Sequence, residues 1–158
     1  MTSEKKQEYT RRITNASKSG LVVIIYDMLL DYLEDAKNAV KQQDYEALSE
    51  AIERAQRCIR EQIASLNFEY KPSSELFSLY VFMQKQLSRI LIYREEKELV
   101  RIREMVIKLR DAYAKISEED HSEPVMKNAQ SIVMGLTYSR NQKLESLTTE
   151  SGNRGFIV

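Results

Sequence analysis

Apolar residues recur at helical spacing in four segments of this chain, and two segments hold more of them than one packed face needs. From Leu21 to Leu33, eleven of thirteen residues are apolar, and only Asp27 and Asp31 interrupt the run. From Leu76 to Met83, seven of eight residues are apolar. A helix that packs on one side needs an apolar stripe about 100° wide. We therefore expect a second face of each helix to be covered by something other than the core.

The spacing predicts four helices of about twenty residues, at 18–42, 45–67, 75–93 and 95–116. Ser17 and Asp44 stand where side chains cap the first two helices, because each can accept a hydrogen bond from a free backbone N–H. Glycine (4) and proline (2), which interrupt helices, are scarce. Short breaks between long helices favour an all-α fold, an antiparallel four-helix bundle over residues 17–116.

Polar flanking regions surround this predicted bundle. Residues 1–16 are charged and polar, with Tyr9 and Ile13 as apolar residues four positions apart, and we interpret them as an N-terminal arm. Residues 117–158 begin with an acidic linker, continue into a short fifth helix at 124–134, which Pro124 can start, and end in a tail. The sequence thus predicts an arm, a bundle and a C-terminal region.

Candidate catalytic and metal-binding residues are few. The chain has one histidine, His121, and one cysteine, Cys58, too few for the paired glutamate and histidine ligands of a metal site inside a helical bundle. No glycine-rich phosphate loop occurs. Asp27 and Asp31 lie four residues apart and could act as paired carboxylates, but such residues more often mark the wet edge of an amphipathic helix. We predict no metal, no cofactor and no enzymatic activity.

Charge and hydropathy narrow the classes of partner. The net charge is zero and the pI is about 6.6, so the chain has no electrostatic footprint for nucleic acid or an anionic membrane. The longest apolar stretch is too short to insert across a bilayer. The polar N-terminus is not a secretory signal, and a single cysteine fits a reducing cytoplasm. The surplus apolar faces then bind a partner, or are covered by the arm, by the fifth helix or by a second copy in a homodimer.

Five segments, read in order, resemble the flagellin-specific export chaperone family (FliS-type). They are Tyr9 ahead of Asn15-Ala16-Ser17, Leu21-Val22-Val23-Ile24-Ile25-Tyr26-Asp27, Ala55-Gln56 with Ile59, Glu61 and Ser65-Leu66-Asn67, Leu79-Tyr80-Val81-Phe82-Met83, and Leu109-Arg110-Asp111-Ala112-Tyr113. The chain departs from the family pattern at Met28, where glycine is frequent, and at Tyr113, which replaces a tryptophan.

The resemblance implies a cytoplasmic chaperone that binds the disordered C-terminal segment of flagellin. Such a chaperone prevents early polymerisation and aids delivery to the flagellar type III export apparatus, without a cofactor. It also implies an arm that lies in a groove and is displaced by flagellin. The expected partner contacts are Tyr9, Ile13, Ile24, Tyr26, Asp27, Met28, Leu79, Tyr80, Phe82 and Met83. The alternative is a self-associating or regulatory helical bundle that binds another amphipathic helix.

Overall fold

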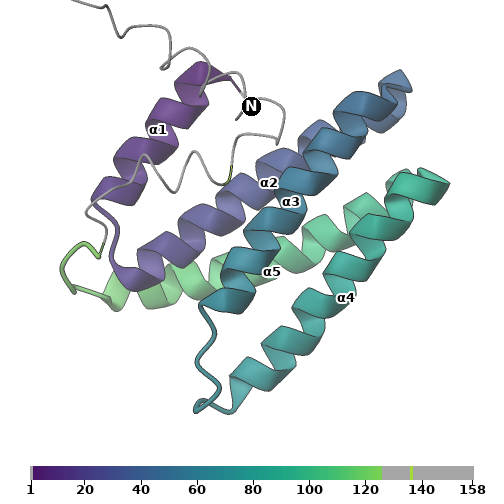
Figure 1. The fold of residues 1–158 in the computed structure, drawn as a ribbon. Coiled ribbons are helices and arrows are strands. Elements are labelled where there is room, and N and C mark those ends of the chain that lie inside the picture. Colours follow the sequence, from purple (N-terminus) through teal and green to yellow (C-terminus); the bar gives the residue numbers. More distant parts are fainter. Residues whose placement is uncertain (1, 126–135, 137–158) are drawn as a thin grey trace, which may run out of the picture.

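All regular elements that the computed structural model describes are helices, which confirms the all-α prediction. The structure describes residues 2–125 and Leu136. The five helices are α1 (Ser3–Thr14), α2 (Lys18–Gln42), α3 (Tyr45–Ala64), α4 (Pro72–Tyr93) and α5 (Glu96–Glu119) (Figure 1). The residues read as an arm therefore form a helix of their own.

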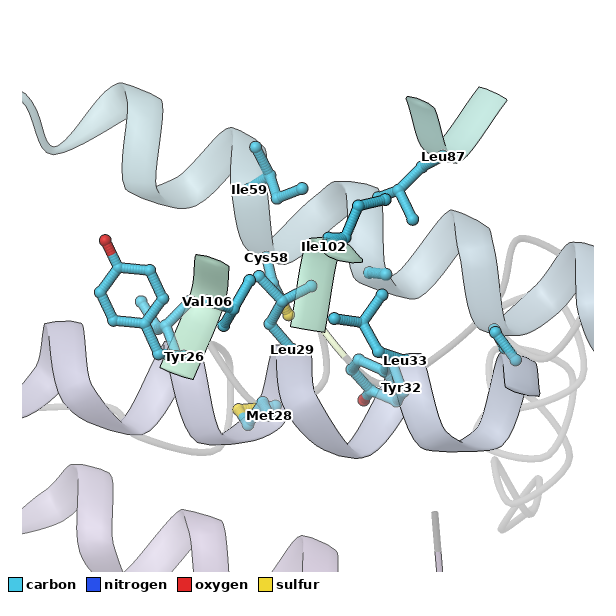
Figure 2. Packing of buried hydrophobic residues seen from close by; sticks show 14 of the residues in the cluster. Tyr26, Met28, Leu29, Tyr32, Leu33, Cys58, Ile59, Leu87, Ile102 and Val106 are labelled. Atoms are coloured by element: carbon cyan, nitrogen blue, oxygen red, sulfur yellow. The ribbon is translucent and has the colours of Figure 1, made fainter. Parts of the chain in front are cut away.

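Helices α2 to α5 pack into one body, which we call the helical core. Helix α2 contacts α3 and α5, and α4 contacts the same two helices, so the four elements close a ring. Successive helices of the ring run in opposite directions in Figure 1. Figure 2 shows Leu29, Cys58, Ile102 and Val106 gathered between the ribbons, and all four side chains are fully buried. Helix α1 packs on α2 and on none of the other described helices.

Local signals at the helix ends explain where α2 and α3 begin and why the chain reverses sharply. The Ser17 hydroxyl accepts a hydrogen bond from the Gly20 N–H at 3.2 Å, and Asp44 Oδ1 accepts one from the Ala47 N–H at 3.0 Å. Both predicted caps are thereby confirmed. Gln43 and Arg94, each at φ 57°, end α2 and α4 in the left-handed conformation. Such a residue turns the chain away from the helix axis and allows a short connection.

Four helix boundaries differ from the predicted ones, and the start of α5, at Glu96 rather than at residue 95, differs by a single residue. Helix α4 begins at Pro72 rather than at residue 75, because proline lacks an N–H and fits the first turn of a helix. Helix α3 ends at Ala64, before residue 67. Helix α5 continues to Glu119, so residues 117–119 belong to it and not to a linker. Pro124 and Val125 are not helical, and the rest of the predicted fifth helix lies outside the described residues.

The chain after α5 is tied to the start of α2 by the Asp120 carboxylate. Oδ1 accepts hydrogen bonds from the Ser122 N–H at 3.0 Å and the Ser122 hydroxyl at 2.6 Å, while Oδ2 accepts one from the Ser19 hydroxyl. The N-terminus of a helix carries a partial positive charge that favours an anion there. These bonds, those from Ser122 foremost, hold the pKa of Asp120 well below its usual range.

We expect this carboxylate to make folding stability sensitive to acid. A carboxyl group whose pKa is lowered in the folded state stabilises the fold above its unfolded pKa, near 3.8 for Asp120, and that stabilisation is lost as the pH falls. The Asp120→Asn variant should melt at a lower temperature than the parent at pH 6, and the difference should shrink as the pH approaches 3. Thermal unfolding followed by circular dichroism measures it, with Asp111→Asn, an exposed carboxylate on α5, as the control. A difference that stays constant with pH would contradict the expectation.

Candidate partner-binding site

The surplus apolar face of α2 is covered by α1. The residues of α2 that the helical spacing directs toward the core form its inner stripe: Val22, Ile25, Leu29, Tyr32, Ala36, Ala39 and Val40. Ile24 and Met28 face away from this stripe and are buried, and Tyr9 and Ile13 of α1 belong to the same buried cluster. A helix of 12 residues such as α1 is marginal in isolation, so contact with α2 is what maintains it. Together with Asp27, these four buried residues make five of the ten predicted contacts, and all five lie on two helices packed against each other.

Polar contacts from α1 converge on the two aspartates that interrupt the apolar run of α2. Arg12 Nη2 lies 2.5 Å from Asp27 Oδ2, and Lys5 Nζ lies 2.8 Å from Asp31 Oδ1. The Tyr9 hydroxyl donates a hydrogen bond to Asp31 Oδ2 at 2.9 Å. We call these contacts the α1 latch. Asp27 and Asp31 thus form ion pairs with a neighbouring helix. This pairing is a structural role for the two carboxylates.

The latch keeps its donors protonated. Burial, followed by the hydrogen bond to Asp31, raises the pKa of the Tyr9 phenol far above its usual value. The hydrogen bond to Asp31 is also the largest cause of the raised pKa of Lys5. Both groups are protonated at neutral pH in any case, and the raised pKa values keep the phenol a donor and the ammonium charged at more alkaline pH as well.

Three tyrosines meet on the other side of α2, inside the helical core. The hydroxyls of Tyr26 on α2 and Tyr80 on α4 share a hydrogen bond, and the rings of Tyr26 and Tyr113 are 5.8 Å apart at 47°. Desolvation raises the pKa of Tyr80 to about 12. Tyr26 and Tyr80, like Met83 beside them on α4, are almost fully buried. A partner could touch these three predicted contact residues only at the edge of the core or after a rearrangement.

We expect the Tyr26–Tyr80 hydrogen bond to show non-additive energetics. Removing one hydroxyl, as in Tyr80→Phe, leaves the other buried without its partner, which costs about 1–3 kcal/mol. Removing both, as in Tyr26→Phe with Tyr80→Phe, should recover most of that loss because no unpaired polar group remains. Urea unfolding of both single variants and the double variant measures the coupling. Additive losses would show that the two hydroxyls do not stabilise each other.

The flank of α4 offers the remaining predicted contacts. Phe82 is 38% exposed, Leu79 is partly buried and Phe77 is 39% exposed, so this flank presents apolar area to solvent. The α4 residues in the predicted contact set thus differ in exposure: Phe82 is exposed, Leu79 is partly buried, and Tyr80 and Met83 are buried.

A large apolar groove opens at the end of the helical core where α2 and α4 begin and α3 and α5 end. Its volume is about 750 Å³. Leu21, Val22 and Ile25 of α2 line it together with Leu76 of α4. The other lining residues are Lys18, Ser19, Gln62, Ser65, Leu66, Asn67, Tyr70, Pro72, Ser73, Tyr80, Tyr113, Asp120 and Val125. We call this hollow the end groove.

Of its lining, sequence reasoning singled out only Tyr80 as a contact residue. Val22 and Ile25 fall on the inner stripe of α2, which predicts core packing. They line the end groove instead, because α3 ends at Ala64. The chain from there to Pro72 contributes residues to the lining and does not fill the groove. The feature that could have indicated this groove is the pair of aromatic residues between α3 and α4, Phe68 and Tyr70. Both side chains are exposed.

Residues 2–125 and Leu136 carry few features of other kinds of site. No group of three or more histidine, cysteine, aspartate or glutamate residues there could hold a metal ion. None of the described helices combines the length and the hydropathy that crossing a membrane requires. Burial raises the pKa of the Cys58 thiol, which lies in the core and is inaccessible from the surface.

Comparison with known proteins identifies a family for this chain. A comparison with curated proteins gave no significant match. The family model described as flagellar protein FliS matches residues 1–120, which include α1 to α5. The α1 latch and nearly all of the end groove fall within that range. A match over this share of the chain identifies the family, and the chain therefore belongs to the FliS family of flagellar export chaperones.

Proposed function

We propose that this chain binds the disordered C-terminal segment of flagellin in the cytoplasm, prevents its premature polymerisation and aids its delivery to the flagellar type III export apparatus. The observation that carries the proposal is the end groove, an apolar hollow of about 750 Å³ beside a face of α2 that only α1 covers among the described helices. An amphipathic segment can place its apolar face in such a groove.

The end groove and the face beneath α1 supply the energy for binding. Burial of a few hundred Å² of apolar surface contributes on the order of 10 kcal/mol at about 25 cal/mol per Å². Ordering a disordered segment costs several kcal/mol of that, and the remainder supports tight binding. Release of flagellin needs no nucleotide or cofactor, because export removes the client from the chaperone.

The ten predicted contacts take different roles in this proposal. Leu79 and Phe82 meet the client directly on α4, and Tyr80 does so where it lines the end groove. Ile24, Asp27 and Met28 become accessible when α1 leaves. In the absence of client, Tyr9 and Ile13 of α1 cover these three residues of α2. Tyr26 and Met83 support the groove from within an antiparallel four-helix bundle.

The test is a calorimetric titration with a synthetic peptide of the C-terminal flagellin segment. Saturable one-to-one binding with a negative heat-capacity change is expected, since apolar surface is buried. A peptide in which serine replaces the apolar residues is the control and should give no heat. Absence of binding to both the full chain and a chain lacking residues 1–16 would contradict the proposal. Concentration-dependent dimerisation in sedimentation would then favour the self-associating bundle.

A further inference from the structure

The C-terminal half of α4 presents a second surface, distinct from the end groove. The groove contains Pro72, Leu76 and Tyr80 from the first half of this helix. Ile92 lies twelve residues beyond Tyr80, or about 18 Å along the axis at 1.5 Å per residue. Ile92 is 70% exposed and Tyr93 is 61% exposed, the most exposed of the large apolar side chains on α4.

Cations surround these exposed apolar residues, and the only acidic residue of α4, Glu75, lies in the first turn, far from them along the helix. Between Leu76 and Arg94 the sequence has no aspartate or glutamate, while Lys85, Arg89 and Arg94 are cationic. Lys85, Arg89 and Ile92 project from the side of α4 opposite its buried residues, since helical positions three and four apart share a face. The α4 residues of this surface are therefore apolar or cationic, and Glu95 and Glu98 are acidic residues that lie beside them.

Both arginines are held in place by tyrosine rings. The Arg94 guanidinium carbon lies 3.5 Å from the centroid of the Tyr45 ring, and that of Arg89 lies 5.6 Å from the centroid of the Tyr93 ring. A guanidinium stacked on a ring keeps its in-plane N–H groups available for a carboxylate. Within residues 2–125 neither arginine forms a salt bridge. The nearby Glu98, which lines a shallow hollow with Arg89 and Tyr93, pairs instead with Arg101.

We propose that this surface, Lys85, Arg89, Ile92, Tyr93 and Arg94 of α4 with Tyr45 of α3, binds an acidic amphipathic helix of a partner protein. Carboxylates of that helix pair with the two stacked arginines while its apolar side packs on Ile92 and Tyr93. Arginine and tyrosine are the residues that most often dominate binding energy at protein interfaces. Three cations are fewer than the four to eight typical of a surface for anionic lipid, which favours the protein partner.

The experiment uses two synthetic helical peptides, one with leucine on one face flanked by glutamates, the other with lysine at each glutamate position. The full chain should bind the acidic peptide, and NMR shift changes should fall on Tyr45 and residues 85–94. Arg89→Glu with Arg94→Glu should weaken this binding about tenfold or more. The same double variant should bind the lysine peptide more tightly than the parent does, a gain that misfolding would not produce.

Matched controls separate this surface from general charge effects and from client binding. Arg60→Glu with Arg103→Glu makes the same change in net charge at exposed positions on α3 and α5 and should leave acidic-peptide binding unchanged. Saturating flagellin peptide should also leave acidic-peptide binding unchanged. If the chain failed to bind flagellin, the expected binding of the acidic peptide would still be the same. Equal losses in both double variants, or shift changes in the end groove, would overturn the proposal. The proposal would also be overturned if the chain bound phosphatidylglycerol vesicles but not the acidic peptide, and if the Arg89 and Arg94 changes abolished the vesicle binding.

Discussion

The Val22→Asp variant is expected to lose about 100-fold in affinity for the flagellin peptide. Val22 lies in the wall of the end groove on α2 and is partly buried there. A carboxylate at this position must lose its water when an apolar segment enters, with no cation from the client to compensate. A penalty of about 3 kcal/mol corresponds to this loss of affinity. Calorimetric titration of parent and variant measures it.

Val100→Asp is the control for this prediction. Val100 is 40% exposed, lies on α5 and is not among the residues that line the end groove. It undergoes the same chemical change inside a helix, so propensity and charge effects are matched. The control should bind like the parent. Thermal unfolding of Val22→Asp establishes that the variant is folded, and unchanged affinity in a folded variant would place the client elsewhere.

The Asp31→Asn variant is expected to bind the flagellin peptide about five- to tenfold more tightly than the parent. Asp31 accepts from both Lys5 and Tyr9, so its neutralisation weakens two contacts of the α1 latch at once. Both partners of the Lys5 pair are partly exposed, which limits each contact to about 1 kcal/mol or less. A weaker latch raises the fraction of molecules with α1 undocked, and apparent affinity rises in proportion.

Glu34→Gln removes one carboxylate from the same helix at an exposed position and is the matched control. Its affinity should equal that of the parent. Deletion of residues 1–16 sets the upper limit of the gain, because it removes the competitor entirely. If the deletion instead lowers affinity steeply, α1 contacts the client and does not compete with it.

Local chemistry made much of the helical framework predictable. Helix starts at Ser17 and Asp44 follow from a side-chain oxygen that reaches an N–H three residues ahead, a contact that sequence spacing alone determines. Helix α4 begins at Pro72 and not at residue 75, and the Ser73 hydroxyl in its first turn donates a hydrogen bond to the Asn67 carbonyl oxygen at 2.6 Å. That bond depends on the path of the preceding loop, which no local rule specifies.

The candidate site was only partly predictable, because its parts depend on contacts between distant residues. The surplus apolar face of α2 signalled that something covers it, and the sequence left several occupants open. Arg12 meets Asp27 across fifteen positions and Lys5 meets Asp31 across twenty-six, pairings that charge patterns within one helix do not reveal. The end groove depends on where α2 and α4 begin relative to where α3 and α5 end. Helix ends are the least predictable feature of a sequence.

The short connection between α1 and α2 makes the latch respond to ionic strength and not to dilution. Only residues 15–17 join the two helices, so α1 remains beside its docking face at any chaperone concentration. Added salt screens the Lys5–Asp31 and Arg12–Asp27 pairs, which are partly exposed, while apolar contacts with a client persist. Flagellin should therefore bind more tightly as ionic strength rises, the reverse of an association driven by charge.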